Sequence, residues 1–225
     1  MLVWLASYPR SGNTWLRILL NRCLGIETFS LYDDRFDIGA NSALRRIVGH
    51  RIHGMDREEF CEHARNSSDT YFVKTHELPV DDARAVYIVR DGRAAVVSYQ
   101  HYICDFGQKT VSLAQVIKGE VFGGSWSDHV EAWALKNRAN TLLLRYKCLV
   151  ADPMQSLQQI AEFLGLPSPR IGSVDFEHLH AAFPRFFRKG SNAANVAELG
   201  GDDLTLFWNL HGETMERMGY QRQCE

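Results

Sequence analysis

The chain has 225 residues, of which 45% are hydrophobic and 23% are charged, and this composition excludes a disordered or fibrous protein. Its formal net charge of -2, from 25 basic and 27 acidic residues, argues against nucleic-acid binding through bulk positive charge. No apolar run approaches the roughly 20 residues that a membrane-spanning helix needs, and the first residues lack the basic region of a signal peptide. We therefore expect a single domain over residues 1–225 and a cytoplasmic location.

Apolar runs and helical patterns alternate along the chain. In chain order, they predict a strand at Leu2–Ala6, a helix at Thr14–Leu24, strands at Tyr71–Val73 and Ala85–Val89, helices at Arg93–Ile103 and Trp126–Asn137, a strand at Thr141–Arg145, and helices at Pro153–Leu164 and Asp203–Met218. The strand runs are continuously apolar, which is typical of parallel strands covered on both faces. The pattern predicts a three-layer α/β fold with a central parallel sheet flanked by helices.

Local signals mark several helix ends. Gly25 is a stop for the first helix, and Asp152 with Pro153 is a start signal for the helix that ends at Gly165. Two segments, Glu27–Gly54 and Ile103–Gly124, have no regular pattern. They are either binding loops or covering helices that the pattern does not reveal.

The five cysteines are scattered, and none belongs to a CxxC pair or stands at metal-ligand spacing from a histidine. They are Cys23, Cys61, Cys104, Cys148 and Cys224. We expect reduced thiols that mostly pack, and no metal site.

The first predicted strand runs through Ser7–Trp15 into a helix, a layout that favours anion binding. Backbone N–H groups at a helix start are unpaired, and the helix dipole favours negative charge. Gly12 allows a close approach to the backbone, Ser11, Asn13 and Thr14 add side-chain donors, and Arg10 adds a cation. The loop is not the nucleoside-triphosphate motif GxxxxGK[ST], because Asn13 follows Gly12 where lysine is required. A capped turn without a ligand is the alternative interpretation.

Two further segments follow predicted strand ends. Arg90 ends a strand, where open α/β sheets place ligands, and Ser98 lies eight residues further on. A surface ion pair of Arg90 with Asp91 and an ordinary helical Ser98 are the alternatives. Lys74, Thr75 and His76 follow another strand, and a histidine beside a lysine suits proton transfer, although an isolated histidine is more often structural.

These three segments resemble the PAPS-dependent sulfotransferase family, where PAPS is 3'-phosphoadenosine-5'-phosphosulfate. SYPRSGNTW is similar to the family's YPKSGTTW, VRDGRAAVVSYQHY to RNPKDVAVSYYHF, and KTHELP to KTHLP. The resemblance implies a P-loop-like fold, in which Ser11, Gly12, Asn13 and Thr14 hold the 5' phosphosulfate, Trp15 stacks on adenine, and Arg90 and Ser98 bind the 3' phosphate. It makes His76 the catalytic base, with Arg10 and Lys74 stabilising the charge on the leaving phosphate. Arg10 departs from the usual lysine.

Three more segments match the family in order. GSWSDHVEAW is similar to GSWFDHVKGWW and predicts a packing helix with Trp126 and Trp133 in the core. LRYK is similar to LFYED and implies that Tyr146 lies near the adenine, although the acidic pair is missing. FRKG is similar to FxRKG and implies that Arg188, Lys189 and Gly190 clamp the 3' phosphate; the following SNAANVAELGG departs from the family's pattern.

The resemblance predicts an enzyme that transfers a sulfuryl group from PAPS, without a metal, to a hydroxyl or amine of a small-molecule acceptor. Aromatic residues in the two irregular segments favour an apolar or aromatic acceptor. A small-molecule kinase is one alternative, because Asp91 follows an apolar strand as a magnesium-binding aspartate would, but a kinase requires the missing lysine. A nucleotide-binding protein without catalysis is the other.

Overall fold

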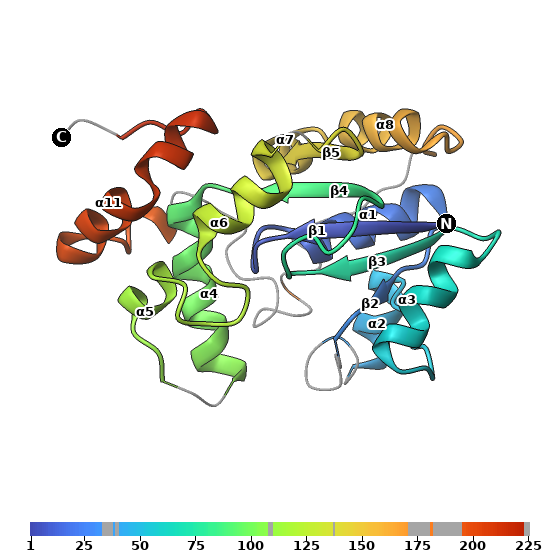
Figure 1. The fold of residues 1–225 in the computed structure, drawn as a ribbon, viewed down its shortest axis with the longest axis horizontal. Helices are drawn as coiled ribbons and strands as arrows, with labels where there is room; N and C mark the ends of the chain where they lie inside the picture. Colours follow the sequence, from blue (N-terminus) through green and yellow to red (C-terminus); the bar gives the residue numbers. More distant parts are fainter. Residues whose placement is uncertain are drawn as a thin grey trace. The chain divides into compact units, whose positions relative to one another are not determined.

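The structure is a computed structural model, and it describes residues 1–32, 38, 41–107, 110–136, 138–170, 181 and 195–222 (Figure 1). The chain forms two compact units. The first contains Met1–Arg90 and Asp128–Ile171, and the second contains Asp91–Ser127 and Gly172–Glu225.

A parallel sheet is the centre of the first unit. Among the described residues it has five strands in the order β2-β3-β1-β4-β5 (Figure 1). The strands are β1 (Leu2–Ser7), β2 (Phe29–Ser30), β3 (Tyr71–Thr75), β4 (Arg84–Val89) and β5 (Thr141–Arg145), and every neighbouring pair is parallel. All residues of β1 are buried, which explains its unbroken apolar sequence.

The strand order brings three loops to one edge of the sheet. β1 lies between β3 and β4, with Ala6 opposite Thr75 and Ser7 opposite Ile88. The chain therefore leaves β1, β3 and β4 at adjacent points on the carboxyl edge, where open α/β sheets place their ligands.

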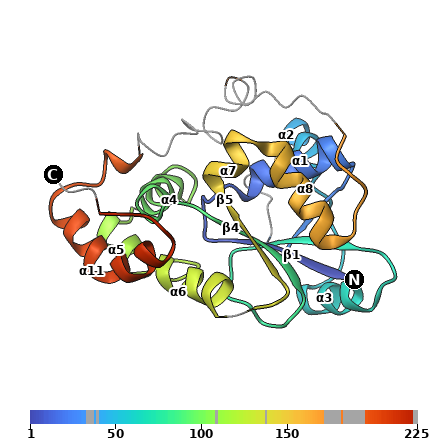
Figure 2. The same ribbon diagram turned by 90° about the horizontal axis from the view of Figure 1, so that it is seen from above.

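Helices cover both faces of this sheet. Figure 2 shows α1 (Asn13–Leu24), α7 (Tyr146–Ala151) and α8 (Pro153–Leu164) on one side of the strands and α3 (Arg57–Asn66) on the other. The short helix α2 (Ser42–Val48) packs against α1. The predicted three-layer α/β fold with a central parallel sheet is confirmed.

The helix-end signals are confirmed at three positions. Gly25 and Gly165 cap α1 and α8 in the left-handed conformation that glycine adopts readily. The Asp152 side chain accepts a hydrogen bond from the Gln155 N–H at the start of α8, with Pro153 in the first turn.

The predicted helix Trp126–Asn137 consists of two elements. α6 (Trp126–Val130) continues directly into η2 (Glu131–Leu135), a π-helical turn. Such wider turns are uncommon and occur often at functional sites. Trp126 and Trp133 are buried, as predicted.

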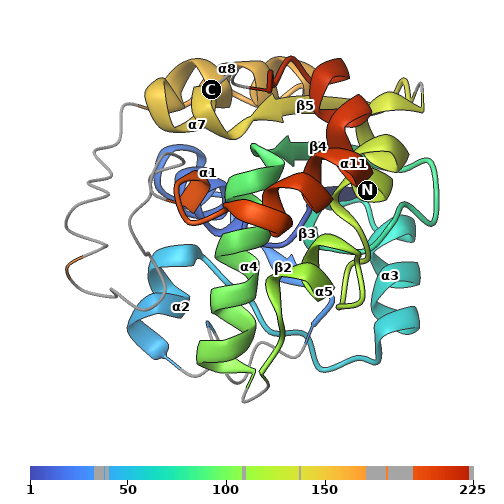
Figure 3. The ribbon, with the colours of Figure 1, turned by 90° about the vertical axis from the view of Figure 1, so that its left-hand side faces the viewer.

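The second unit is built from helices. Figure 3 shows α4 (Gly92–Phe106) beside α5 (Leu113–Ile117) and α11 (Gly201–Arg217), and these three helices contact one another. The rings of Trp126, Phe207 and His211 pack together in its interior. The irregular segment Ile103–Gly124 thus contains the end of α4 and all of α5, and Glu27–Gly54 contains β2 and α2.

No helix in the described part of the chain has the length and apolar character needed to cross a membrane. Cys23 and Cys61 are buried thiols, Cys104 is half-buried and Cys148 is exposed, whereas Cys224 lies outside the described residues.

Candidate active site

The loop between β1 and α1 has an unusual backbone. Arg10 has a φ of 64°, and among the described residues it is the one non-glycine residue with positive φ. Gly12, which precedes the first residue of α1, has a φ of 104°. A non-glycine residue in this region costs about 1–3 kcal/mol, and such strain persists mainly at functional sites.

Side chains inside the loop differ in what they can offer a ligand. The Asn13 amide Nδ2 donates to Leu5 O at 2.8 Å and to Ser7 Oγ at 3.3 Å, so it ties α1 to β1. The Ser11 side chain is buried, and its Oγ has no hydrogen-bond partner within the described ranges. A buried hydroxyl without a partner is costly, and an oxygen of a bound phosphate or sulfate would satisfy it. The loop therefore fits an anion better than it fits a capped turn.

Tyr146 and Arg90, which come from two different parts of the chain, lie beside the loop that contains Gly12. A Cβ atom at Gly12 would lie 2.5 Å from Cδ2 of Tyr146, so only glycine fits against this ring. The Arg90 guanidinium lies 4.8 Å from the centre of the same ring, and its Nη1 donates to Arg10 O at 2.9 Å. Arg90 is buried and helps to hold the strained Arg10 backbone.

Asp91 was considered as the ion-pair partner of Arg90 or as a ligand of magnesium, and in the structure it pairs with Arg93. In the second unit its carboxylate caps α4 by accepting from the Arg93 N–H, and it also pairs with the Arg93 guanidinium at 2.8 Å. The carboxylate is therefore committed to α4 and Arg93, which weakens the comparison with a magnesium-binding aspartate.

His76 follows β3 directly and contacts Ser7, the last residue of β1 before the β1–α1 loop. Its Nδ1 lies 2.7 Å from Ser7 O, and because a carbonyl only accepts, Nδ1 carries the proton. The ring lone pair is then on Nε2. Burial, aided by the charge of Lys74, lowers the pKa of His76 well below its ordinary value of 6.5. His76 is thus a neutral imidazole near pH 7, as a general base must be.

Lys74 and Tyr32 adjoin this histidine. The Lys74 side chain is buried in β3, and its Nζ lies 5.5 Å from the centre of the Tyr32 ring. The Tyr32 ring is stacked parallel to the His76 imidazole, with centroids 5.8 Å apart. Burial raises the pKa of Tyr32 to about 12, so this residue stays a neutral phenol.

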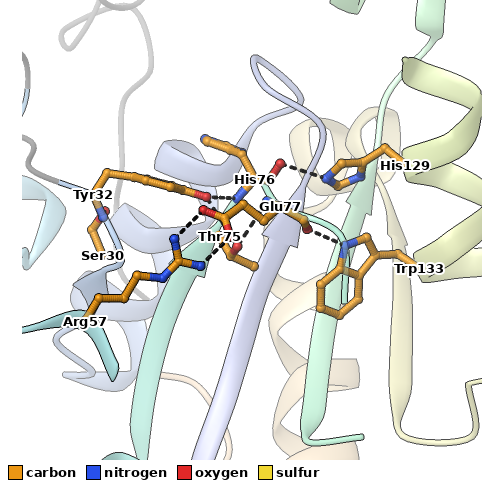
Figure 4. Close-up of polar contacts among 8 residues, drawn as sticks. All are labelled: Ser30, Tyr32, Arg57, Thr75, His76, Glu77, His129 and Trp133. Atoms are coloured by element: carbon orange, nitrogen blue, oxygen red, sulfur yellow. Dashed lines mark hydrogen bonds and ion pairs between the residues drawn. The ribbon is translucent and has the colours of Figure 1, made fainter. Parts of the chain in front are cut away.

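Several residues around His76 were not predicted from the sequence. Figure 4 shows the segment Thr75–Glu77 between Tyr32 and Arg57 on one side and His129 and Trp133 on the other. Arg57 pairs with Glu77 through Nη1 and Nη2 of its guanidinium, and this hydrogen bonding raises the pKa of Arg57. The segment SWSDHVEAW, which contains His129 and Trp133, predicted core packing and gave no sign of a contact with the His76 backbone.

Of the remaining residues assigned to the donor site from the sequence, some are described by the structure and some are not. The Trp15 side chain is buried, and its Nε1 donates to Leu149 O at 3.3 Å. Thr14 is half-buried in the first turn of α1, and Ser98 is buried in α4 of the second unit. Arg188, Lys189 and Gly190 lie outside the described residues. Their assignment to the donor site stays a prediction.

In the part of the chain that the structure describes, no group of three or more His, Cys, Asp or Glu side chains is arranged to hold a metal ion. The described geometry places a loop with a buried, unpartnered Ser11 hydroxyl beside a neutral histidine and a buried lysine, at the carboxyl edge of a parallel α/β sheet. A bound anion and a base would be neighbours in this arrangement.

Sequence comparison gives the family. The profile described as the sulfotransferase domain matches residues 2–196, so the chain belongs to the sulfotransferase family. Sulfotransferase 1C2 of Rattus norvegicus is 24% identical over 72% of this chain and 57% of its own length. Sulfotransferase 2B1 of Homo sapiens is 29% identical over 76% of this chain and 49% of its own length. The chain thus spans about half the length of these curated relatives.

A solved structure supports the fold. The mouse sulfotransferase SULT7A1 complexed with PAP has a TM-score of 0.69 and 24% sequence identity to this chain, over 96% of this chain and 84% of that one. This likeness confirms the predicted P-loop-like α/β fold.

Proposed function

We propose that the chain transfers the sulfuryl group of PAPS to a hydroxyl or amine of a small-molecule acceptor, with His76 as the general base. One observation carries this proposal. The imidazole that would take the acceptor's proton is hydrogen-bonded, through Nδ1, to the carbonyl of Ser7, where the anion-binding loop begins. A single hydrogen bond therefore connects the proposed base to the start of the proposed anion site.

Donor binding would be shared by the loop and its neighbours. PAPS supplies an activated sulfuryl group on its 5' phosphate. We assign the 5' phosphosulfate to Ser11, Gly12, Asn13 and Thr14, and the buried Ser11 hydroxyl supports this assignment. Because the Asn13 amide donates to Leu5 and Ser7, its contribution would come from the backbone N–H.

The rest of the donor would contact residues from later elements. We assign the adenine to Trp15 and Tyr146, and the 3' phosphate to Arg90, Ser98, Arg188, Lys189 and Gly190. The contact of Arg90 with Tyr146 and with the Arg10 carbonyl supports a role beside the loop. Mouse SULT7A1 and retinol dehydratase, two proteins of similar fold, were both solved in complex with PAP, which agrees with this assignment.

The chemistry would be an in-line displacement at sulfur. His76 Nε2 takes the acceptor's proton as the acceptor oxygen or nitrogen forms its bond to sulfur. The bond between sulfur and the leaving phosphate oxygen breaks, and PAP leaves with the electron pair. Arg10 and Lys74, with the loop N–H groups, stabilise the negative charge that develops on that oxygen. Positioning and charge stabilisation carry most of such transfers, and none of these steps calls for a metal.

Residues 1–225 would act as one sulfotransferase domain, in the cytoplasm, on small molecules. One relative is a flavonol 3-sulfotransferase of Flaveria bidentis, and the retinol dehydratase of similar fold was solved in complex with androsterone. Phenols and apolar alcohols are therefore the first acceptors to examine.

The test is a transfer assay with purified protein. PAPS is incubated with a phenol, an apolar alcohol or an amine, and formation of PAP and of the sulfated product is measured by chromatography. We expect PAP to form in an acceptor-dependent manner without added metal. Transfer of phosphate from ATP with magnesium, and none from PAPS with any acceptor, would overturn the proposal.

A further inference from the structure

The backbone around His76 is held by side chains on both sides. On one side, the Tyr32 hydroxyl accepts a hydrogen bond from the His76 N–H at 2.5 Å and lies 3.3 Å from Thr75 Oγ1. Thr75 Oγ1 also accepts from the Glu77 N–H at 3.1 Å. The Tyr32 ring therefore stacks on the imidazole while its hydroxyl fixes the peptide that carries it.

On the other side, two ring nitrogens donate to consecutive carbonyls. His129 Nε2 lies 3.2 Å from His76 O, and Trp133 Nε1 lies 2.9 Å from Glu77 O. The two residues are four positions apart, at the junction of α6 and η2, and so lie on one face (Figure 4). They hold the two successive peptide units on either side of Glu77, the first of which begins at the His76 carbonyl.

The hydrogen bonds also fix the tautomer of His129. Because His76 O can only accept, His129 Nε2 carries the proton, and His129 Nδ1 must accept from the Tyr87 hydroxyl at 3.0 Å. His129 is completely buried, and burial lowers its pKa to about 4. It therefore stays neutral near pH 7 and keeps its donor directed at the His76 carbonyl.

We propose that His129 is a positioning residue for His76, and that it acts with Tyr32 and Trp133 to hold the imidazole in the orientation in which Nδ1 donates to Ser7 O. The consequence is that Nε2 keeps the lone pair that proton abstraction requires. A different rotation of the peptide would move the ring away from Ser7 O, and the tautomer would no longer be fixed. The inference rests on the proposed function, since it concerns the proposed base.

The second unit contains a matched control. His211 is also buried, its Nδ1 lies 2.7 Å from Ser127 Oγ, and its Nε2 lies 2.9 Å from Ile117 O. It therefore has the same pattern as His129, a hydroxyl at Nδ1 and a backbone carbonyl at Nε2. The same substitution at His211 removes a similarly buried histidine whose hydrogen-bond partners, Ser127 and Ile117, are not predicted site residues.

The experiment compares His129→Leu, His129→Gln and His211→Leu with the wild type in two measurements. The first is ¹⁵N NMR of the His76 ring, assigned with His76→Ala, which reports the tautomer without any acceptor. The second is kcat and KM with PAPS and 4-nitrophenol. Glutamine can place a donor near the position of Nε2, so it serves as the conservative replacement.

We expect one protonated Nδ1 in the wild type and in His211→Leu, and a mixture of His76 tautomers in His129→Leu. We expect kcat to fall on the order of 10- to 100-fold in His129→Leu, as for a displaced catalytic group, with KM for PAPS unchanged and kcat partly restored in His129→Gln. If His129→Leu does not fold, Tyr87→Phe removes the hydroxyl that fixes His129 and should give a smaller change in the same direction.

An unchanged His76 tautomer in folded His129→Leu or Tyr87→Phe would overturn the inference, as would equal losses of kcat in His129→Leu and His211→Leu. A wild-type protein that fixes the His76 tautomer but transfers no sulfuryl group would instead contradict the proposed function. The two failures are therefore distinguishable.

Discussion

The two loops that meet at His76 and Ser7 differ in how far their contacts reach along the chain. Ser7–Thr14 is shaped mainly by its own residues, through positive φ at Arg10 and Gly12 and through the short-range hydrogen bonds of Asn13, and Arg90 adds one long-range hydrogen bond to Arg10 O. Thr75–Glu77 is held by side chains from distant parts of the chain: Tyr32, His129 and Trp133 bond to it from 44, 53 and 56 residues away. The backbone of the first loop is therefore encoded largely by its own sequence, whereas the orientation of the proposed base depends on tertiary structure.

The largest expected effect separates chemistry from binding. His76→Ala removes the proposed base but none of the assigned donor contacts, so kcat should fall by roughly 10²–10⁴-fold while PAP binds as before. Steady-state kinetics and calorimetry measure the two quantities. His63→Ala, which changes an exposed histidine in α3, is the control and should match the wild type. A His76→Ala enzyme close to wild-type activity would show that the loop does not supply the base.

The next effect concerns the stability that buried His129 gives to the folded protein at different pH values. His129 has a pKa of about 4 in the folded protein, against 6.5 for an ordinary histidine. The unfolded chain therefore binds a proton first as the pH falls, and stability that is complete above pH 6.5 is lost toward pH 4. The shift corresponds to roughly 3 kcal/mol, at about 1.4 kcal/mol for each pH unit.

Urea unfolding at several pH values measures this loss. The free energy of unfolding of the wild type should fall more steeply between pH 6.5 and pH 4 than that of His129→Gln, which has no group at this position to protonate. If the free energy of unfolding falls equally with pH in the two proteins, His129 is not a buried, neutral side chain in the folded state.

A smaller effect tests the backbone of the β1–α1 loop, to which we assign the 5' phosphosulfate. Gly12 and Gly25 both have positive φ, but a Cβ atom would meet the Tyr146 ring at Gly12 and nothing within 4 Å at Gly25. Alanine at either position should cost about 1–2 kcal/mol of stability through backbone strain. At Gly12 the clash with the Tyr146 ring should add to this cost. Only Gly12→Ala should also weaken PAP binding, by about tenfold, or about 1.4 kcal/mol. Equal PAP affinities in the two variants would contradict the predicted role of Gly12.

The sequence predicted those parts of the fold whose signals are local. Thr141–Arg145 and Pro153–Leu164 have the predicted bounds, because one is a continuous apolar run and the other has an N-cap, a proline and a terminal glycine. α3 was missed because it buries only Phe60, Cys61 and Ala64, too few for a clear amphipathic pattern. α7 was missed because it begins immediately after β5 without a side-chain cap.

The residues of the candidate site also differ in whether the local sequence marks them. Ser11, Gly12 and His76 could be selected from short motifs, because each lies beside a strand end that the apolar pattern marks. Tyr32, His129 and Trp133 could not, because their importance arises from contacts with one peptide segment that only the folded chain brings to them. Tyr32 lies in a segment without a clear pattern, and the other two carry the signal of ordinary core residues.

The most direct test of the central claim is a calorimetric titration with PAP, the desulfated product of PAPS. Arg84 begins β4 and Arg90 follows its last residue, with Arg90 beside the β1–α1 loop and Arg84 against Phe163. We predict that PAP binds the wild type and Arg84→Ala equally, that ATP with magnesium does not replace it, and that Arg90→Ala weakens binding on the order of 10- to 100-fold, the value of a hydrogen bond to a charged group. Absence of PAP binding, or a preference for ATP with magnesium, would contradict the assignment of this site to a sulfuryl donor.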